Sequence, residues 1–245
     1  MKTLLGTSQG DFNRRAADFV QRALAMRPDA TVALPTGRTP LGLYAELRAR
    51  HARGEFEPGD IRFFQLDEYV GFGATDPRSF AFTLRAGFLS HLSAARANIH
   101  MIRGDAPDLL VECDRYETLI ADHGGIDLAI LGLGANGHIG FNEPGTSWNS
   151  WTHVVPLAEE TRAAMSALAG IFETADLPRR GITMGIGTIL EAREILLLVR
   201  GTSKRPALEA LLRGKPDPRW PVTALLSHPR LTAILSEEFD VAENA

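Results

Sequence analysis

One short stretch of the chain carries the polar residues with the clearest potential for catalysis. Residues 126–145 read IDLAILGLGANGHIGFNEPG, in which an apolar run ends in glycines and Asn136, His138 and Glu143 follow. An imidazole that a neighbouring amide or carboxylate holds in place is a usual arrangement for acid–base chemistry. Because no serine or cysteine stands beside His138, the stretch gives no support to acyl-enzyme chemistry.

The same stretch contains a formal G-x-G-x-x-G fingerprint, formed by Gly132, Gly134 and Gly137. A dinucleotide site requires the last glycine of this fingerprint to open a helix whose N-terminus holds the pyrophosphate. Here Gly140 and the pair Pro144 and Gly145 interrupt the run too early for a stable helix. The glycines therefore predict a turn that presents His138, and they argue against a dinucleotide site.

Two other segments carry groups that suit a phosphate. The sequence PTGRTP places Thr36, Gly37, Arg38 and Thr39 between a predicted strand and a predicted helix. Backbone N–H groups, hydroxyls and a cation at a helix N-terminus favour an anion. Lys204 opens another predicted helix and offers a second phosphate contact. The alternatives are a plain turn with a threonine cap at the first segment and a solvated surface lysine at the second.

A pair of acids follows the next apolar run, in the sequence QLDEYVG. Adjacent residues of a strand point to opposite faces, so Asp67 and Glu68 are not expected to act together on one substrate. One of them would face the site while the other caps a helix or forms an ion pair. A buried Asp67 is a candidate general base. Two strand-end acids in solvent are the alternative.

The hydrophobic pattern alternates between strands and helices, which predicts an α/β fold around a mostly parallel sheet. Strands are expected over residues 31–34, 61–66, 126–131, 152–157, 195–199 and 231–235. Helices are expected over residues 11–26, 79–92, 107–122, 159–168 and 202–212, with a further one beginning at Thr39 and Pro40. In such sheets ligands bind beyond the carboxyl ends of the strands. Three polar segments follow strand ends here, at residues 35–39, 67–69 and 132–143, and they are expected to converge. No linker divides the pattern, so residues 1–245 are expected to form a single domain.

Composition narrows the classes of partner. The chain has 245 residues, 44% of them hydrophobic, and a net charge of −4, which argues against nucleic acid or an anionic membrane as partner. Its single cysteine, Cys113, cannot form an internal disulfide, and no pair of residues has zinc-ligand spacing, so no metal is expected. No apolar run reaches membrane-spanning length and the N-terminus lacks a signal-like apolar region, so a cytoplasmic location is expected.

Three motifs together resemble the glucosamine-6-phosphate deaminase family. They are LPTGRTPLGLY, FFQLDEYVG and LGLGANGHIGFNEPG, and a weaker likeness continues through ITMGIGTILEA, GTSK and LTAIL. The resemblance implies a modified Rossmann-like fold, with helices flanking the sheet, and an aldose–ketose isomerase and deaminase that acts on an amino-sugar phosphate. The related 6-phosphogluconolactonases share the fold and a Gly-His core, but they continue differently where this chain has IGFNEP.

The resemblance also implies a role for each matching residue. Asp67 matches the base that moves a proton from C2 toward C1, and His138 matches the group that opens the sugar ring. Glu143 matches the acid that orients this histidine, and Asn136 falls where members have aspartate or asparagine. Ammonia is then released, and no metal or organic cofactor is implied. The implied partner is a small-molecule sugar phosphate, without nucleic acid or membrane.

The chain departs from the family pattern in two places. Members bind the phosphate with an arginine in the helix that follows TR, where this chain has Ala167 and Leu168. Arg38 stands where familiar members have glycine or serine, and we expect it to replace the missing charge. Hexameric members also carry basic residues after the NEP motif that bind an activator, near His153 and Val155 here. We therefore expect no such activation and a monomer or small homo-oligomer.

Three functions follow from these observations. The first is the deaminase reaction that converts glucosamine 6-phosphate and water to fructose 6-phosphate and ammonia. The second is a related sugar-phosphate enzyme with altered specificity, or a hydrolase of the 6-phosphogluconolactonase type. The third is a sugar-phosphate sensor, which would need the phosphate loop but no enolising base.

Overall fold

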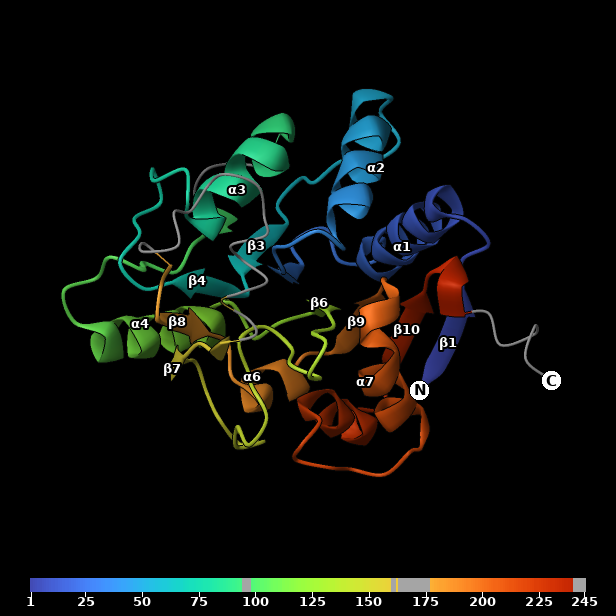
Figure 1. Cartoon of the computed structure of the whole chain (residues 1–245). Helices are drawn as coiled ribbons and strands as arrows, with labels where there is room; N and C mark the ends of the chain where they lie inside the picture. Colours follow the sequence, from blue (N-terminus) through green and yellow to red (C-terminus); the bar gives the residue numbers. More distant parts are fainter. Residues whose placement is uncertain (94–97, 160–161, 163–176, 240–245) are drawn as a thin grey trace.

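A seven-stranded parallel sheet forms the centre of the molecule (Figure 1). The computed structural model describes residues 1–93, 98–159, 162 and 177–239. The strands of this sheet are β1 (Lys2–Leu5), β2 (Thr31–Leu34), β3 (Arg62–Gln65), β5 (Ile99–His100), β6 (Leu128–Gly132), β9 (Glu194–Val199) and β10 (Leu231–Leu235). Their order is β1-β10-β9-β6-β2-β3-β5, and every neighbouring pair is parallel. The predicted fold class is confirmed, although β1 and β5 were not predicted.

Helices cover both faces of this sheet. The helices α1 (Gln9–Leu24), α2 (Leu41–Ala52) and α3 (Phe80–Gly87) share one hydrophobic core with the strands. The helices α4 (Leu109–Asp122), α6 (Ile186–Leu190) and α7 (Arg205–Leu212) share the other. Successive residues of β9 alternate between the two, since Leu196 and Leu198 belong to the first core and Ile195 and Leu197 to the second. This burial on both faces explains why central strands read as unbroken apolar runs.

A second, smaller sheet was not predicted. It joins β4 (Asp67–Tyr69), β8 (Arg180–Thr183) and β7 (His153–Pro156) in antiparallel pairs. The expected strand 61–66 ends at Gln65, and the chain enters β4 only two residues later. Asp67 pairs with Thr183, so the candidate base lies on a short strand whose position depends on β8.

Several expected boundaries require correction. Thr39 does not cap α2, because Pro40 is the N-cap residue and no side chain forms a cap hydrogen bond there. The expected helix 202–212 is a 3-10 turn, η4 (Thr202–Lys204), followed by α7. The expected helix 79–92 divides into α3 and the 3-10 turn η1 (Leu89–His91). Most of the expected helix 159–168 lies outside the described residues. None of the described helices is long and apolar enough to cross a membrane.

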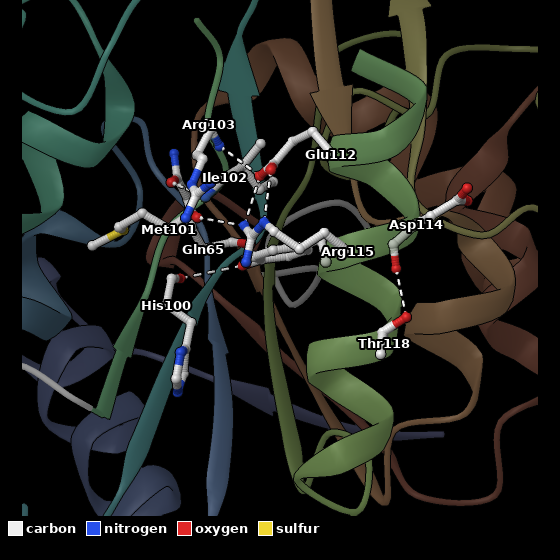
Figure 2. Close-up of polar contacts among 10 residues, drawn as sticks. Gln65, His100, Met101, Ile102, Arg103, Glu112, Asp114, Arg115 and Thr118 are labelled. Atoms are coloured by element: carbon white, nitrogen blue, oxygen red, sulfur yellow. Dashed lines mark hydrogen bonds and ion pairs between the residues drawn. The ribbon is translucent and has the colours of Figure 1, made fainter. Parts of the chain in front are cut away.

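The end of β3 is braced from the side of α4, as Figure 2 shows. The Arg103 N–H donates to Glu112 Oε1 over 2.8 Å, and the Arg115 guanidinium donates to both oxygens of the same carboxylate. Beside this group, the Ile102 N–H donates to Gln65 Oε1 over 3.2 Å. Of these bonds, the one from Ile102 holds the side chain of Gln65, two residues before Asp67.

Candidate active site

A pocket of about 560 Å³ opens at the carboxyl ends of the parallel strands. Its walls come from four segments, at residues 35–40, 66–69, 132–141 and 200–204, with Phe80 of α3 closing one side. Seven of the predicted site residues line it: Thr36, Gly37, Arg38, Thr39, Asp67, His138 and Lys204. The three polar segments therefore do converge. Asn136 and Glu143 lie behind His138, within reach of its ring.

Asp67 is a buried carboxylic acid at the edge of this pocket. It is 6% exposed, and Thr36 Oγ1 donates to Asp67 Oδ1 over 3.4 Å. Burial and, secondarily, the negative charge of Glu68 raise the pKa of Asp67 to about 7, while the Thr36 hydroxyl opposes this shift. A carboxyl with this pKa can both take and return a proton near neutral pH, as a general base requires.

Glu68 points away from the pocket and caps α3. Its carboxylate accepts hydrogen bonds from the N–H groups of Tyr69, Phe80 and Ala81 and from Gln65 Nε2, all between 2.8 and 2.9 Å. Burial raises the pKa of Glu68, and these donors oppose the shift. The expectation that one acid faces the site and the other caps a helix is confirmed. The alternative of two solvated acids is wrong, since Glu68 is fully buried.

His138, Asn136 and Glu143 form a hydrogen-bonded chain. His138 Nδ1 lies 2.8 Å from Asn136 Oδ1 and 3.7 Å from Glu143 Oε2. Asn136 Nδ2 donates to Glu143 Oε2 over 2.6 Å, which directs the amide oxygen toward the imidazole. An amide oxygen can only accept, so Nδ1 carries the proton and Nε2 is left available to the pocket.

Glycines shape the turn that presents His138. A Cβ atom at Gly134 would lie 2.4 Å from the His138 ring, so only glycine leaves room for the imidazole there. Gly137 has a φ of +86°, in the left-handed region that glycine favours. No helix begins between residues 133 and 152, all of which the structure describes. The dinucleotide fingerprint therefore lacks the helix that it needs, as predicted.

The strand β8 ties this turn to the strand that carries Asp67. The Phe141 N–H donates to Thr183 Oγ1 over 3.1 Å, and Asn142 Nδ2 donates to the Met184 carbonyl over 2.8 Å. The Met184 N–H in turn donates to the Leu66 carbonyl over 2.9 Å. The base and the imidazole are thus held by one short piece of chain.

The cationic side of the pocket contains one residue that the sequence analysis missed. Lys204 is half-buried, and burial lowers its pKa, so the alternative of a solvated surface lysine is wrong. Arg38 is exposed at the rim. Arg200 also lines the pocket, directly after β9. Its place beyond the carboxyl end of a central strand is the signal that could have identified it. The positions Ala167 and Leu168 lie outside the described residues.

Three aromatic residues form an aromatic wall of the pocket, which too was not predicted. Tyr69, Phe80 and Phe141 all line the pocket. The ring centroid of Tyr69 lies 4.2 Å from that of Phe80 and 5.5 Å from that of Phe141. Such a wall suits the apolar face of a ring-shaped ligand. Within the described part of the chain, no group of three His, Cys, Asp or Glu side chains could hold a metal ion.

Comparison with known proteins agrees with this geometry. Residues 10–233 match the model of the family described as glucosamine-6-phosphate isomerases/6-phosphogluconolactonase. The chain belongs to this family. Among its members, the glucosamine-6-phosphate deaminase of Thermoanaerobacter pseudethanolicus is 38% identical, over 97% of this chain and 93% of its own length. That of Shouchella clausii is 41% identical, over 93% of this chain and 92% of its own.

Solved structures of the glucosamine-6-phosphate isomerase/6-phosphogluconolactonase family superpose on the whole fold. A monomeric glucosamine-6-phosphate deaminase superposes with a TM-score of 0.93 at 38% identity, covering 97% of this chain and 98% of its own. The 6-phosphogluconolactonase from Trypanosoma cruzi superposes with a TM-score of 0.81 at 20% identity, covering 100% and 97%. At that identity the second likeness shows the fold alone.

Proposed function

We propose that this family member is a glucosamine-6-phosphate deaminase, which converts glucosamine 6-phosphate and water to fructose 6-phosphate and ammonia. The observation that carries the proposal is the buried Asp67, with a pKa raised to about 7, in the same pocket as His138. Enolisation requires one positioned carboxylate whose pKa lies near the working pH. The relatives at 38% and 41% identity carry the same name.

In the proposed reaction, His138 first moves a proton between the ring oxygen and the C1 hydroxyl, which opens the sugar ring. Its Nε2 is the available atom, because Nδ1 is bonded to Asn136. Glu143 holds the Asn136 amide and thereby the orientation of the imidazole. We therefore assign a positioning role to Asn136 and Glu143, which the hydrogen-bonded chain supports.

Asp67 then removes the proton from C2 of the open-chain amino aldose and returns it to C1. The electron pair of the broken C–H bond forms the C1=C2 double bond of an enolamine, and the aldehyde oxygen takes up a proton. The nitrogen lone pair then forms the C=N bond of an imine as C1 takes up the proton from Asp67, and the nitrogen loses one proton in exchange for the one gained by the oxygen. Water adds to the imine carbon and ammonia leaves, giving the ketose. The steps are proton transfers, the addition of water and the loss of ammonia, without a net oxidation or reduction, so the proposal includes no cofactor and no metal.

The phosphate of the substrate is placed at the cationic side of the pocket. Thr36, Gly37, Arg38, Thr39 and Lys204, all of which line the pocket, form this subsite. Hydroxyl groups, backbone N–H groups and two cations suit a phosphate dianion. We propose that Arg38 supplies charge to this subsite from the rim. The aromatic wall of Tyr69, Phe80 and Phe141 packs against the sugar carbon atoms.

A lactone hydrolase on the same fold is the second candidate, and a non-catalytic sensor is the third. The sequence IGFNEP, where the lactonases continue differently, argues against the hydrolase. The buried Asp67 argues against the sensor, which needs no enolising base. The proposal further includes a monomer, as described for a deaminase at 38% identity, and a cytoplasmic location.

Ammonia release from glucosamine 6-phosphate tests the proposal, with Asp67→Asn as the key variant. The wild-type protein should release ammonia, and Asp67→Asn should abolish this release while phosphate still binds. Asp60→Asn is a matched control, since Asp60 is exposed and does not line the pocket. Lactone hydrolysis without ammonia would select the second candidate. Binding of the sugar phosphate without turnover would select the third.

A further inference from the structure

The C-terminal end of the described chain contacts the cationic side of the pocket. The 3-10 turn η6 (Glu237–Phe239) follows β10, and its Phe239 side chain is buried. The Gly201 N–H donates a short hydrogen bond to Glu238 Oε1. Arg205 Nη2 donates to the Glu238 carbonyl over 2.7 Å, and its guanidinium lies 5.5 Å from the Phe239 ring centroid. Both ends of the loop that carries Lys204 are therefore attached to η6.

Gly201 is the point at which this attachment reaches the pocket. It lines the pocket, whereas Glu238 does not, so the carboxylate approaches from the outer side. Gly201 has a φ of +96°, in the left-handed region. A glycine without a fixed contact would populate several other backbone conformations as well. The Lys204 N–H donates to the Gly201 carbonyl over 2.9 Å. One continuous line of bonds thus runs from Glu238 through Gly201 to Lys204.

The Glu238 carboxyl is suited to act as a charged acceptor. Burial opposes ionisation, but a hydrogen bond with the Ser236 side chain, the Gly201 N–H and the positive charge of Arg200 together lower its pKa. The group is therefore an anion at neutral pH, and hydrogen bonds to ionised acceptors are the stronger ones. Its charge also faces Arg200, a second cation of the pocket wall.

We propose that Glu238 is a positioning residue, which holds the loop 201–204 so that Lys204 faces the phosphate of the substrate. The inference rests on the proposed function only for the identity of the ligand. Without the Glu238 carboxylate, Gly201 is free to leave its left-handed conformation, and Lys204 loses its fixed place. Glu238 lies outside the motifs that carry the resemblance, near the end of the chain.

The test compares Glu238→Ala, Glu238→Gln and the matched control Glu237→Ala. Glu237 is the exposed neighbour in the same turn and carries the same charge. We expect Glu238→Ala to raise KM for glucosamine 6-phosphate and the dissociation constant for inorganic phosphate by about tenfold each, with kcat within about twofold of wild type. Glu238→Gln keeps an oxygen acceptor for the Gly201 N–H and should recover part of the loss. Glu237→Ala should match wild type.

A second comparison places the effect at Lys204. In a Lys204→Ala background, Glu238→Ala should add little further loss of phosphate affinity, because the two residues act as one unit. The proposal is overturned if Glu238→Ala leaves phosphate affinity unchanged, or if its loss is as large without Lys204 as with it. A fall in kcat with an unchanged KM also contradicts it.

Calorimetric binding of inorganic phosphate separates this inference from the proposed function. If the wild-type protein releases no ammonia, the deaminase proposal fails, while the phosphate dissociation constants still decide the role of Glu238. Thermal melting of each variant accompanies the binding measurements. If Glu238→Ala does not fold, the phosphate affinities of Glu238→Gln and Glu237→Gln are compared instead. Equal phosphate affinities of those two variants overturn the proposal.

Discussion

The carboxylates of Asp67 and Glu68 leave adjacent positions of β4 in opposite directions, one into the pocket and one into the N-terminus of α3. The negative charge of Glu68 acts on its neighbour through a buried, low-dielectric environment, where charges interact more strongly than in water. Glu68 thus fixes the segment that closes the pocket and also raises the pKa of the proposed base. The carboxylate of Glu68 therefore has both a structural and an electrostatic effect on the pocket.

Glu68→Gln should therefore shift the pH dependence of the reaction. Removing the charge lowers the pKa of Asp67, so the acidic limb of the kcat/KM profile should move to lower pH. The control is Glu112→Gln, which removes another buried carboxylate, one that contacts Arg103 and Arg115 (Figure 2) and does not line the pocket. An unmoved limb in Glu68→Gln would show that its charge does not act on Asp67.

Asp67→Asn should stabilise the protein while it abolishes turnover. Below pH 3.8 the carboxyl is protonated in the folded and the unfolded chain, but between there and about pH 7 only the unfolded chain ionises. The folded state therefore loses stability as the pH rises, by about 4 kcal/mol in total. Unfolding of wild type and variant in urea at pH 5 and pH 8 measures this. A stability gain that does not grow with pH would contradict the raised pKa.

Asn136→Ala should impair the imidazole without impairing binding. The substitution removes both the acceptor of His138 Nδ1 and the donor to Glu143. We expect kcat to fall by about 10- to 100-fold, within the usual contribution of a positioned acid–base group, with KM nearly unchanged. Asn136→Asp keeps the oxygen that accepts from the ring and should lose less. Equal losses in the two variants would exclude an orienting role.

Arg38→Ala tests whether the cation at the rim binds phosphate. The variant should raise KM for glucosamine 6-phosphate far more than for unphosphorylated glucosamine, by about tenfold for a charge-assisted contact. Lys204→Ala serves as the comparison, since Lys204 is the other cation assigned to the same subsite and also lines the pocket. Equal effects of Arg38→Ala on both sugars would assign Arg38 a role outside phosphate binding.

The kinetics of the wild-type protein should be hyperbolic and indifferent to N-acetylglucosamine 6-phosphate. The resemblance puts the basic activator ligands of hexameric members near His153 and Val155, which lie in β7 here, and Val155 is buried. Light scattering should give the mass of a monomer, or of a small oligomer at most. Sigmoidal kinetics that the N-acetylated sugar phosphate relieves would contradict this prediction.

Much of the site could be predicted because its residues follow apolar runs. The rule that ligands bind beyond strand ends brought the segments 35–39, 67–69 and 132–143 together, and the alternation of strand residues separated Asp67 from Glu68. The same rule applied to β9 identifies Arg200, which we did not predict. The burial of Asp67, which raises its pKa, depends on packing from α3 and β8 that no local pattern reveals.

The small sheet could not be predicted for a different reason. Its strands β4 and β8 have three and four residues, too few for an alternating pattern to be distinguished from a loop. Thr39 was expected to cap α2, but local sequence cannot tell a capping hydroxyl from one that lines a pocket. The contact of Glu238 with Gly201 could not be predicted from any local pattern, because the two residues lie far apart in the sequence and come together only in the folded chain.

The attachment of both the Asp67 strand and the His138 turn to Thr183 and Met184 has a consequence for the order of synthesis. A nascent chain that has emerged only as far as residue 179 already contains Asp67, Asn136, His138 and Glu143. It lacks the strand that holds them against one another. Activity should therefore arise only once translation has passed β8. A shorter polypeptide on the ribosome should be inactive, although it contains all of the proposed catalytic residues.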